Sequence, residues 1–130
     1  MIKKEAQFTI RFRHWIKANP MPSGAFELKS TRGENRFPFR ELQEHQEQAL
    51  LASKSKEGLF FKIPDIGVAY NPFDCFYLRN AYAWVVIEYP QGFVIIDIDN
   101  FILARSKTKE KSLTWARAQE ISHQTIRKNR

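Results

Sequence analysis

The sequence predicts an α/β (α+β) fold in which helices flank one mixed central sheet, in the order α-β-α-β-β-β-β-α. Three observations predict this class. A helical spacing of apolar residues opens the chain, a short alternating segment follows it, and several apolar, β-rich runs come after residue 58. With 130 residues, 43% of them hydrophobic, the chain suits one domain with one core, so residues 1–130 are expected to form a single domain.

Residues 4–17 are predicted to form the first helix. Apolar side chains recur there at i, i+4, i+7 and i+8, namely Phe8, Phe12, Trp15 and Ile16. An alternation of Phe8, Ile10 and Phe12 makes a strand the alternative, and Pro20 ends the segment either way.

Residues 24–30 are predicted to form a strand, because apolar residues alternate between turn formers. Residues two apart on a strand share a face. Glu27 and Lys29 should therefore lie side by side, with Phe26 and Leu28 on the other face. A surface ion pair is the ordinary interpretation of Glu27 and Lys29, and a metal-assisted catalytic pair is the alternative.

The remaining elements follow from local signals. Residues 40–53 are predicted to form a second helix, whose acidic residues come early, as the helix dipole prefers. Four β-like runs come next, at residues 59–63, 73–78, 81–89 and 93–98. Residues 112–127 are predicted to form a terminal helix, with Ser112 as a possible N-cap.

Charge is distributed unevenly along a chain whose net charge is +7. Residues 1–40 and 101–130 each carry +6, whereas residues 41–100 carry −5. Basic ends around an acidic middle fit a protein that binds phosphates and keeps carboxylates for a metal, and a solvated basic surface is the alternative. One cysteine, no membrane-length apolar run and no signal-peptide pattern lead us to expect a cytoplasmic protein without a membrane partner.

Two segments taken together resemble a known family. The Glu27-x-Lys29 strand is followed by Phe37-Pro38-Phe39 and by the run Glu44-His45-Gln46. This combination resembles the PD-(D/E)xK nucleases, and most closely the RecU-type Holliday-junction resolvases. The resemblance covers about two thirds of the chain. It implies a restriction-endonuclease-like sheet and a single nuclease-like domain.

The chain departs from this family at one position. The family has an Asp on a hairpin shortly before the Glu-x-Lys strand, and no acid lies between His14 and Ala25. The inserted runs after the second helix look like that hairpin, moved along the chain. Asp74 is the preferred substitute, Asp65 the alternative, and both could instead be ordinary turn acids.

The resemblance implies Mg²⁺-dependent phosphodiester cleavage, with Mn²⁺ as a possible substitute. Asp74 and Glu27 would supply carboxylates, the Leu28 carbonyl a third oxygen, and Glu5 a further ligand. Glu5 could equally be a partner of the helix dipole. Lys29 would stabilise the transition-state charge. Gln46 would position Lys29 or water, or would simply pack within its helix.

Basic residues are expected to bind the phosphates of DNA rather than to read bases. They are Arg11, Arg13 and Lys17 on the first helix, Arg32, Arg36 and Arg40 after the Glu-x-Lys strand, and Lys107, Lys109 and Lys111 near the last helix. Symmetric cutting of a branched junction implies a homodimer. The sequence leaves junction, flap and duplex open as substrates. A DNA-binding module that has lost cleavage is the alternative function. Asp97 and Asp99 are expected to lie on one solvated face of the last strand.

Overall fold

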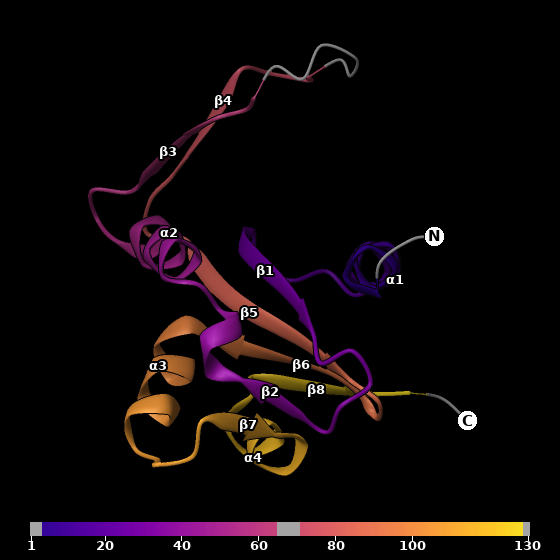
Figure 1. The fold of residues 1–130 in the computed structure, drawn as a ribbon. Coiled ribbons are helices and arrows are strands. Elements are labelled where there is room, and N and C mark those ends of the chain that lie inside the picture. Colours follow the sequence, from indigo (N-terminus) through magenta and orange to yellow (C-terminus); the bar gives the residue numbers. More distant parts are fainter. Residues whose placement is uncertain (1–3, 65–70, 129–130) are drawn as a thin grey trace.

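The computed structural model describes residues 4–64 and 71–128, which form an α+β fold with a mixed sheet (Figure 1). Its helices are α1 (Lys4–Ala18), α2 (Glu44–Lys54), α3 (Ile98–Ser106) and α4 (Trp115–Ile121), with a 3₁₀ turn at Phe39–Glu41. Its strands are β1 (Gly24–Ser30), β2 (Arg36–Pro38), β3 (Leu59–Lys62), β4 (Cys75–Leu78), β5 (Tyr82–Tyr89), β6 (Gly92–Asp97), β7 (Ser112–Thr114) and β8 (Gln124–Arg127).

Four strands form the central sheet in the order β1-β5-β6-β8. β1 runs parallel to β5, with Gly24 opposite Tyr82 and Glu27 opposite Val85. β5, β6 and β8 pair antiparallel. The β5–β6 turn requires glycine at residue 92, because φ is 153° there and a Cβ would lie 2.1 Å from the Ile126 carbonyl oxygen. The sheet is therefore mixed, as predicted.

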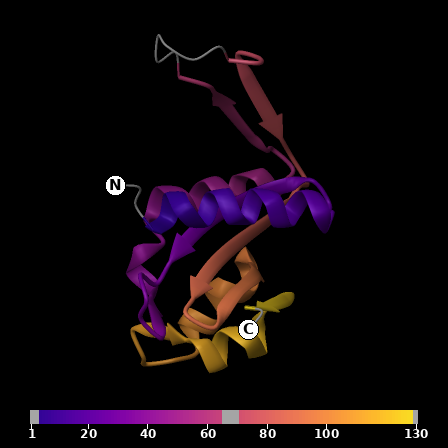
Figure 2. The ribbon, with the colours of Figure 1, turned by 90° about the vertical axis from the view of Figure 1, so that its right-hand side faces the viewer.

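Each face of the sheet is covered by helices. α1 covers one face, where Phe8 and Phe12 pack with Trp84 and Val86 (Figure 2). α2, α3 and α4 cover the other face, and the core there contains residues from all three helices and from β5 and β6, namely Leu50, Val85, Ile87, Val94, Ile96, Phe101 and Ala118. The predicted inward stripe of the first helix is thus confirmed.

The C-terminal part of the chain differs from the prediction. Residues 98–106 form α3 rather than a continued strand, because the Asp97 side chain caps the helix by accepting a hydrogen bond from the Asp99 N–H at 2.8 Å. The predicted helix 112–127 is wrong at both ends. Residues 112–114 pair with β2 and residues 124–127 pair with β6, and only Trp115–Ile121 is helical.

β3 and β4 form a two-stranded hairpin of their own, which we call the arm (residues 59–62 and 75–78). In both ribbon views the arm projects away from the central sheet (Figures 1 and 2). Its inner end lies where β4 leads into β5. No helix within residues 4–64 and 71–128 has the length and apolar content needed to cross a bilayer.

Candidate functional site

Glu27, Lys29 and Gln46 lie together on one face of the sheet. Glu27 and Lys29 share a face of β1, as the alternation predicted, and this face is the one that α2 covers. The Lys29 Nζ lies 3.8 Å from the Glu27 Oε1. The Gln46 Nε2 donates a hydrogen bond of 3.0 Å to the same oxygen. The Glu27 carboxylate is therefore oriented by a strand neighbour and by a helix.

Gln46 also fixes the beginning of α2. Its Oε1 accepts a hydrogen bond from the Gln43 N–H at 3.0 Å, and the Gln43 side chain bonds in return to the backbone at position 46. This reciprocal capping box satisfies backbone groups that a helix N-terminus otherwise leaves unpaired. One amide thus joins the α2 N-terminus to Glu27. The predicted role of Gln46 toward Lys29 or water stays a prediction, and the bond to Glu27 was not predicted.

Lys29 is buried, while Glu27 is partly exposed. The Lys29 side chain is 10% exposed and that of Glu27 is 31% exposed. A buried ammonium needs a charged or polar partner, and Glu27 supplies one. The pair presents a carboxylate to solvent with a cation behind it. This arrangement can hold a hard cation at the carboxylate and place positive charge beside a bound phosphate.

The predicted second carboxylate does not join this pair within one copy of the chain. Asp74 is exposed and directly precedes β4, where its carbonyl accepts a hydrogen bond from the Ile63 N–H at 2.8 Å. Among the strands of the described residues, β4 pairs with β3 only, and it begins at the end of the arm remote from the sheet (Figure 1). Asp74 is four residue steps, about 13 Å of extended chain, from Leu78 at the arm's inner end. The prediction that the Asp74 carboxylate bridges to Glu27 in the same chain is wrong.

The other predicted ligands divide as follows. Asp65 lies outside the described residues. Glu5 falls in the first turn of α1, and its side chain also lies outside what the structure describes. The Leu28 carbonyl lies between Glu27 and Lys29 on β1. Within the described residues, no three His, Cys, Asp or Glu side chains gather as a metal site would require. Glu27 is thus a suitable ligand for Mg²⁺, but it does not make up a complete ligand set.

The predicted basic residues fall into separate groups. Arg13 and Lys17 are exposed on α1, and Arg32 is exposed in the turn after β1. Arg11 forms an ion pair with Glu88 of β5, whose side chain is only 12% exposed. Part of the Arg11 charge is therefore already neutralised. The exposed lysines of the α3–β7 connection are Lys107, Lys109 and Lys111.

A second basic group surrounds the β2–β7 pair. Arg36 is exposed on β2, and Arg40 follows it in the 3₁₀ turn. Arg40 and Lys111 line one cavity of about 400 Å³, which Arg105 also borders. Arg105 donates to both oxygens of Glu47, at 2.5 and 3.2 Å, and this hydrogen bond raises the pKa of the guanidinium. We call Arg36, Arg40 and Lys111 the β2–β7 basic patch.

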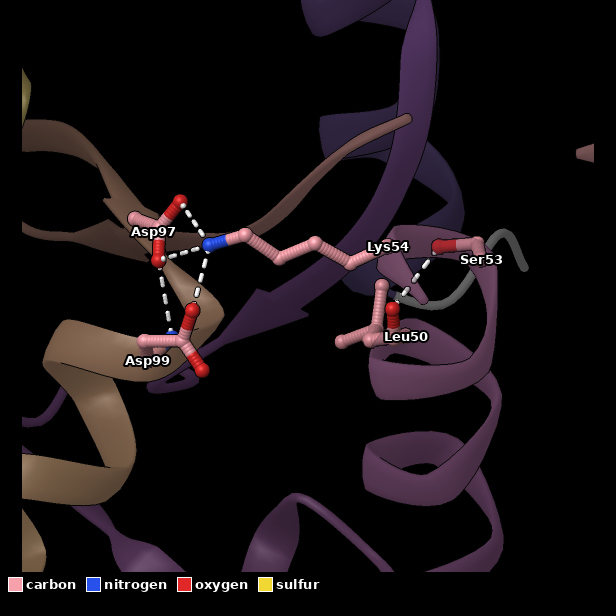
Figure 3. Close-up of polar contacts among 5 residues, drawn as sticks. All are labelled: Leu50, Ser53, Lys54, Asp97 and Asp99. Atoms are coloured by element: carbon pink, nitrogen blue, oxygen red, sulfur yellow. Dashed lines mark hydrogen bonds and ion pairs between the residues drawn. The ribbon is translucent and has the colours of Figure 1, made fainter. Parts of the chain in front are cut away.

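A polar cluster that the sequence did not predict joins α2 to the β6–α3 junction. Lys54 extends from the last turn of α2 toward two carboxylates (Figure 3). Its Nζ lies 2.9 Å from both oxygens of Asp97 and 2.5 Å from the Asp99 Oδ2. Burial alone would lower the pKa of Lys54, but the hydrogen bonds to Asp99 and Asp97 outweigh it, so the pKa is raised.

This cluster corrects the expectation of a solvated strand face. Asp97 ends β6 and caps α3, whereas Asp99 lies in the first turn of α3. Both carboxylates are engaged with Lys54. The apolar spacing of Ile98, Phe101 and Ile102 after a capping Asp was the signal that could have predicted the helix. No local signal pointed to Lys54.

No protein-family model, curated protein sequence or solved structure matches this chain. Any function proposed for it therefore depends on the residues and geometry described above.

Proposed function

We propose that this protein is a Mg²⁺-dependent, structure-selective DNA endonuclease with a restriction-endonuclease-like fold, acting as a homodimer on branched DNA such as a four-way junction. Mn²⁺ would substitute for Mg²⁺. The observation that carries the proposal is the joint placement of Glu27, Lys29 and Gln46. A carboxylate, a buried ammonium 3.8 Å away and an orienting amide lie on one sheet face, next to an open strand edge.

Each of these side chains has a distinct task in phosphodiester hydrolysis. When bound, Mg²⁺ would polarise the phosphate and favour ionisation of a coordinated water. Glu27 would hold the ion, and the Leu28 carbonyl would add an oxygen. Lys29 would stabilise negative charge that develops on the phosphate oxygens. Gln46 would keep the Glu27 carboxylate in one orientation, so that little reorganisation is needed on binding.

The basic groups would bind the DNA backbone. Two residues of the β2–β7 basic patch, Arg36 and Arg40, come just before α2 in the chain, and α2 carries Gln46, which contacts Glu27. DNA bound at the patch would lie beside the segment that leads into this helix. Arg13, Lys17 and Arg32 would contact further phosphates. Such contacts do not read sequence, which fits selection of DNA by shape. Binding should weaken steeply as salt rises.

A nucleic-acid-binding module without cleavage is the second candidate. The observation that favours it is that no three His, Cys, Asp or Glu side chains gather at one place within the described residues. Mg²⁺ commonly binds through one or two carboxylates together with substrate phosphates, so Glu27 alone does not decide between the two functions.

A digestion assay separates them. Four-way junction, flap and duplex of the same sequence are incubated at low salt with Mg²⁺ or Mn²⁺. The proteins are wild type, Glu27→Gln and, as a matched control, Glu120→Gln, whose exposed carboxylate pairs with Arg117 in the same helix. We expect preferential junction cutting that Glu27→Gln abolishes and Glu120→Gln leaves unchanged.

Two other results would change the conclusion. Equal cutting of all three substrates would leave a nuclease without junction selectivity. Binding without any cutting, together with no Mg²⁺ uptake in a calorimetric titration, would establish the binding module.

A further inference from the structure

The outer edge of β1 is open. β1 lies at the end of the strand order β1-β5-β6-β8, and no strand within residues 4–64 and 71–128 pairs with its outer side. Gly24 to Leu28 are only partly buried along this edge. An unpaired edge leaves backbone donors and acceptors ready to bind another strand. Glu27 and Lys29 lie on this strand, so a strand added here would border the candidate site.

The arm exposes an unusual amount of aromatic surface. Four rings on or beside it are roughly half exposed: Phe60 at 66%, Phe61 at 45%, Phe73 at 53% and Tyr77 at 52%. A two-stranded hairpin that projects from its domain is marginal by itself in water. Exposed apolar patches of this kind mark interaction surfaces. The arm therefore has the character of an element that packs against another chain.

The exposed surface is large enough for a dimer. At about 200 Å² for each ring, the four half-exposed rings present on the order of 400 Å². In a two-fold dimer both arms are buried, and each covers a matching area on the other copy. The total then exceeds roughly 1,000 Å², which is the size that a specific interface needs.

The arm also carries the carboxylate that the site lacks. Asp74 is exposed and stands directly before β4, at the end of the arm that its own β1 does not approach. The outer edge of β4 is as open as that of β1, since β3 is the only strand that pairs with β4 within residues 4–64 and 71–128. One chain thus contains an open edge at β1, which carries Glu27, and an open edge at β4, which begins beside Asp74.

We propose that the arm of a second copy of this chain adds its β4 strand to the outer edge of β1, and that the partner's Asp74 completes the metal site at Glu27. By two-fold symmetry each copy gives an arm and receives one, and the dimer contains two shared sites. Backbone hydrogen bonds hold the added strand, and the aromatic rings pack over it. This inference rests on the proposed function for the role of Asp74, while the assembly itself stands independently of it.

Subunit mixing tests the shared site. Glu27→Gln and Asp74→Asn should each abolish cleavage. When the two variants are unfolded and refolded together in equal amounts, about half of the dimers are mixed and each mixed dimer has one intact site. We expect nicking of one junction strand to return to about one quarter of the wild-type rate. If the mixture stays as inactive as either variant, or if Asp74→Asn alone keeps full activity, the shared site is refuted.

A cross-linking experiment tests the assembly without any cleavage. Cys75 follows Asp74 and is the only cysteine in the chain. Because neighbouring strand residues face opposite sides, a partner strand that brings Asp74 to Glu27 brings Cys75 to the Phe26 and Leu28 face. Oxidised Phe26→Cys or Leu28→Cys should therefore form a covalent dimer in which the introduced thiol is joined to Cys75 of the other copy, as peptide mapping would show. Glu57→Cys, an exposed position outside β1, is the matched control and should not form this link. Absence of the link in both Phe26→Cys and Leu28→Cys would overturn the proposed docking.

Sedimentation gives a third readout and separates this inference from the proposed function. Phe60→Ser should shift the protein from dimer to monomer, whereas Leu103→Ser, on α3 and 49% exposed, should not. A wild-type monomer at tens of micromolar would refute the dimer. A dimer with the expected cross-link but without nuclease activity would refute the proposed function and keep the assembly.

Discussion

Replacing Gln46 with Glu separates its two hydrogen bonds. Glu retains an acceptor for the Gln43 N–H, so the capping box at the start of α2 survives. It cannot, when ionised, donate to the Glu27 Oε1, which lies 3.0 Å from the present donor. Instead it places a second carboxylate beside Glu27. The substitution therefore tests the link between α2 and Glu27 without disturbing the helix cap.

The expected cost follows from the geometry. Two like charges about 4 Å apart repel by about 1 kcal/mol in water and about 4 kcal/mol at an effective dielectric of 20. The Glu27 side chain is 31% exposed, so we take an intermediate value of about 2 kcal/mol for the repulsion. The lost hydrogen bond to a charged group adds about 1.5 kcal/mol. Gln46→Glu should thus lower the free energy of unfolding at pH 7 by about 3.5 kcal/mol.

Acid should remove most of this cost. Repulsion raises the folded-state pKa of the carboxylate pair above the unfolded value of about 4.3. For a raised pKa, stability is fully present below the unfolded pKa and is lost as pH rises through the folded pKa. The difference in unfolding free energy between Gln46→Glu and the wild type should therefore be about 2 kcal/mol smaller at pH 4 than at pH 7.

Urea unfolding of the wild type, Gln46→Glu and Gln46→Met at both pH values measures these effects. Gln46→Met loses the cap and the hydrogen bond but adds no charge, so its difference in unfolding free energy from the wild type should change less between the two pH values than that of Gln46→Glu. The reasoning is refuted if Gln46→Glu is as stable as the wild type at pH 7, or if its difference from the wild type is the same at pH 4.

Four further predictions follow from other contacts. Lys29→Ala should leave junction binding in a gel-shift assay nearly intact and reduce cleavage by about 10²–10³-fold; an equal loss of both would make Lys29 a phosphate anchor only. Lys111→Gln should reduce the slope of log binding constant against log salt by about 1, and an unchanged slope would remove Lys111 from the DNA-binding surface. Tyr89 is buried, donates to the Leu113 carbonyl at 2.7 Å and has a pKa raised by burial above 10. The stability that comes from the protonated Tyr89 hydroxyl is present below pH 10, and above it the free energy of unfolding should fall by about 1.4 kcal/mol per pH unit. Urea unfolding at pH 8 and 11 measures this fall, and Tyr89→Phe should not show it. Lys54→Met should lower the free energy of unfolding by about 1 kcal/mol, because the ion pairs of Lys54 are partly exposed. The difference in thermal midpoint between variant and wild type should shrink in 1 M NaCl, which screens ion pairs, whereas an entirely apolar effect would not shrink.

The sequence predicted the elements that depend on local periodicity. The strand 24–30 and the shared face of Glu27 and Lys29 are confirmed, because alternation directly determines which side chains share a face. The first helix is confirmed over Lys4–Ala18 for the same kind of reason, with Phe8 and Phe12 buried on its inner side.

What the sequence could not predict depends on pairing between distant segments. Residues 112–114 and 124–127 contain no signal that separates them from helix, yet each finds a strand partner, β2 and β6 respectively. The position of Asp74 failed for a related reason. A strand was correctly predicted within residues 73–78, where it covers Cys75–Leu78, but which strand it pairs with, and in which direction the hairpin points, are tertiary properties.

The connection between β1 and β5 has a consequence for how this chain tolerates insertions. Gly24 and Tyr82 are paired although they are 58 positions apart (82 minus 24), and both strands of the arm lie within that connection, between residues 59 and 78. Closing a connection costs an entropy that grows only with the logarithm of its length. Shortening it from 58 to 38 positions by removing those 20 residues would change this cost by about 0.4 kcal/mol. The crossover can therefore gain, lose or exchange its projecting hairpin with almost no effect on whether β1 pairs with β5. Evolution could vary what the arm contacts while Glu27 and Lys29 stay in the same place on the sheet.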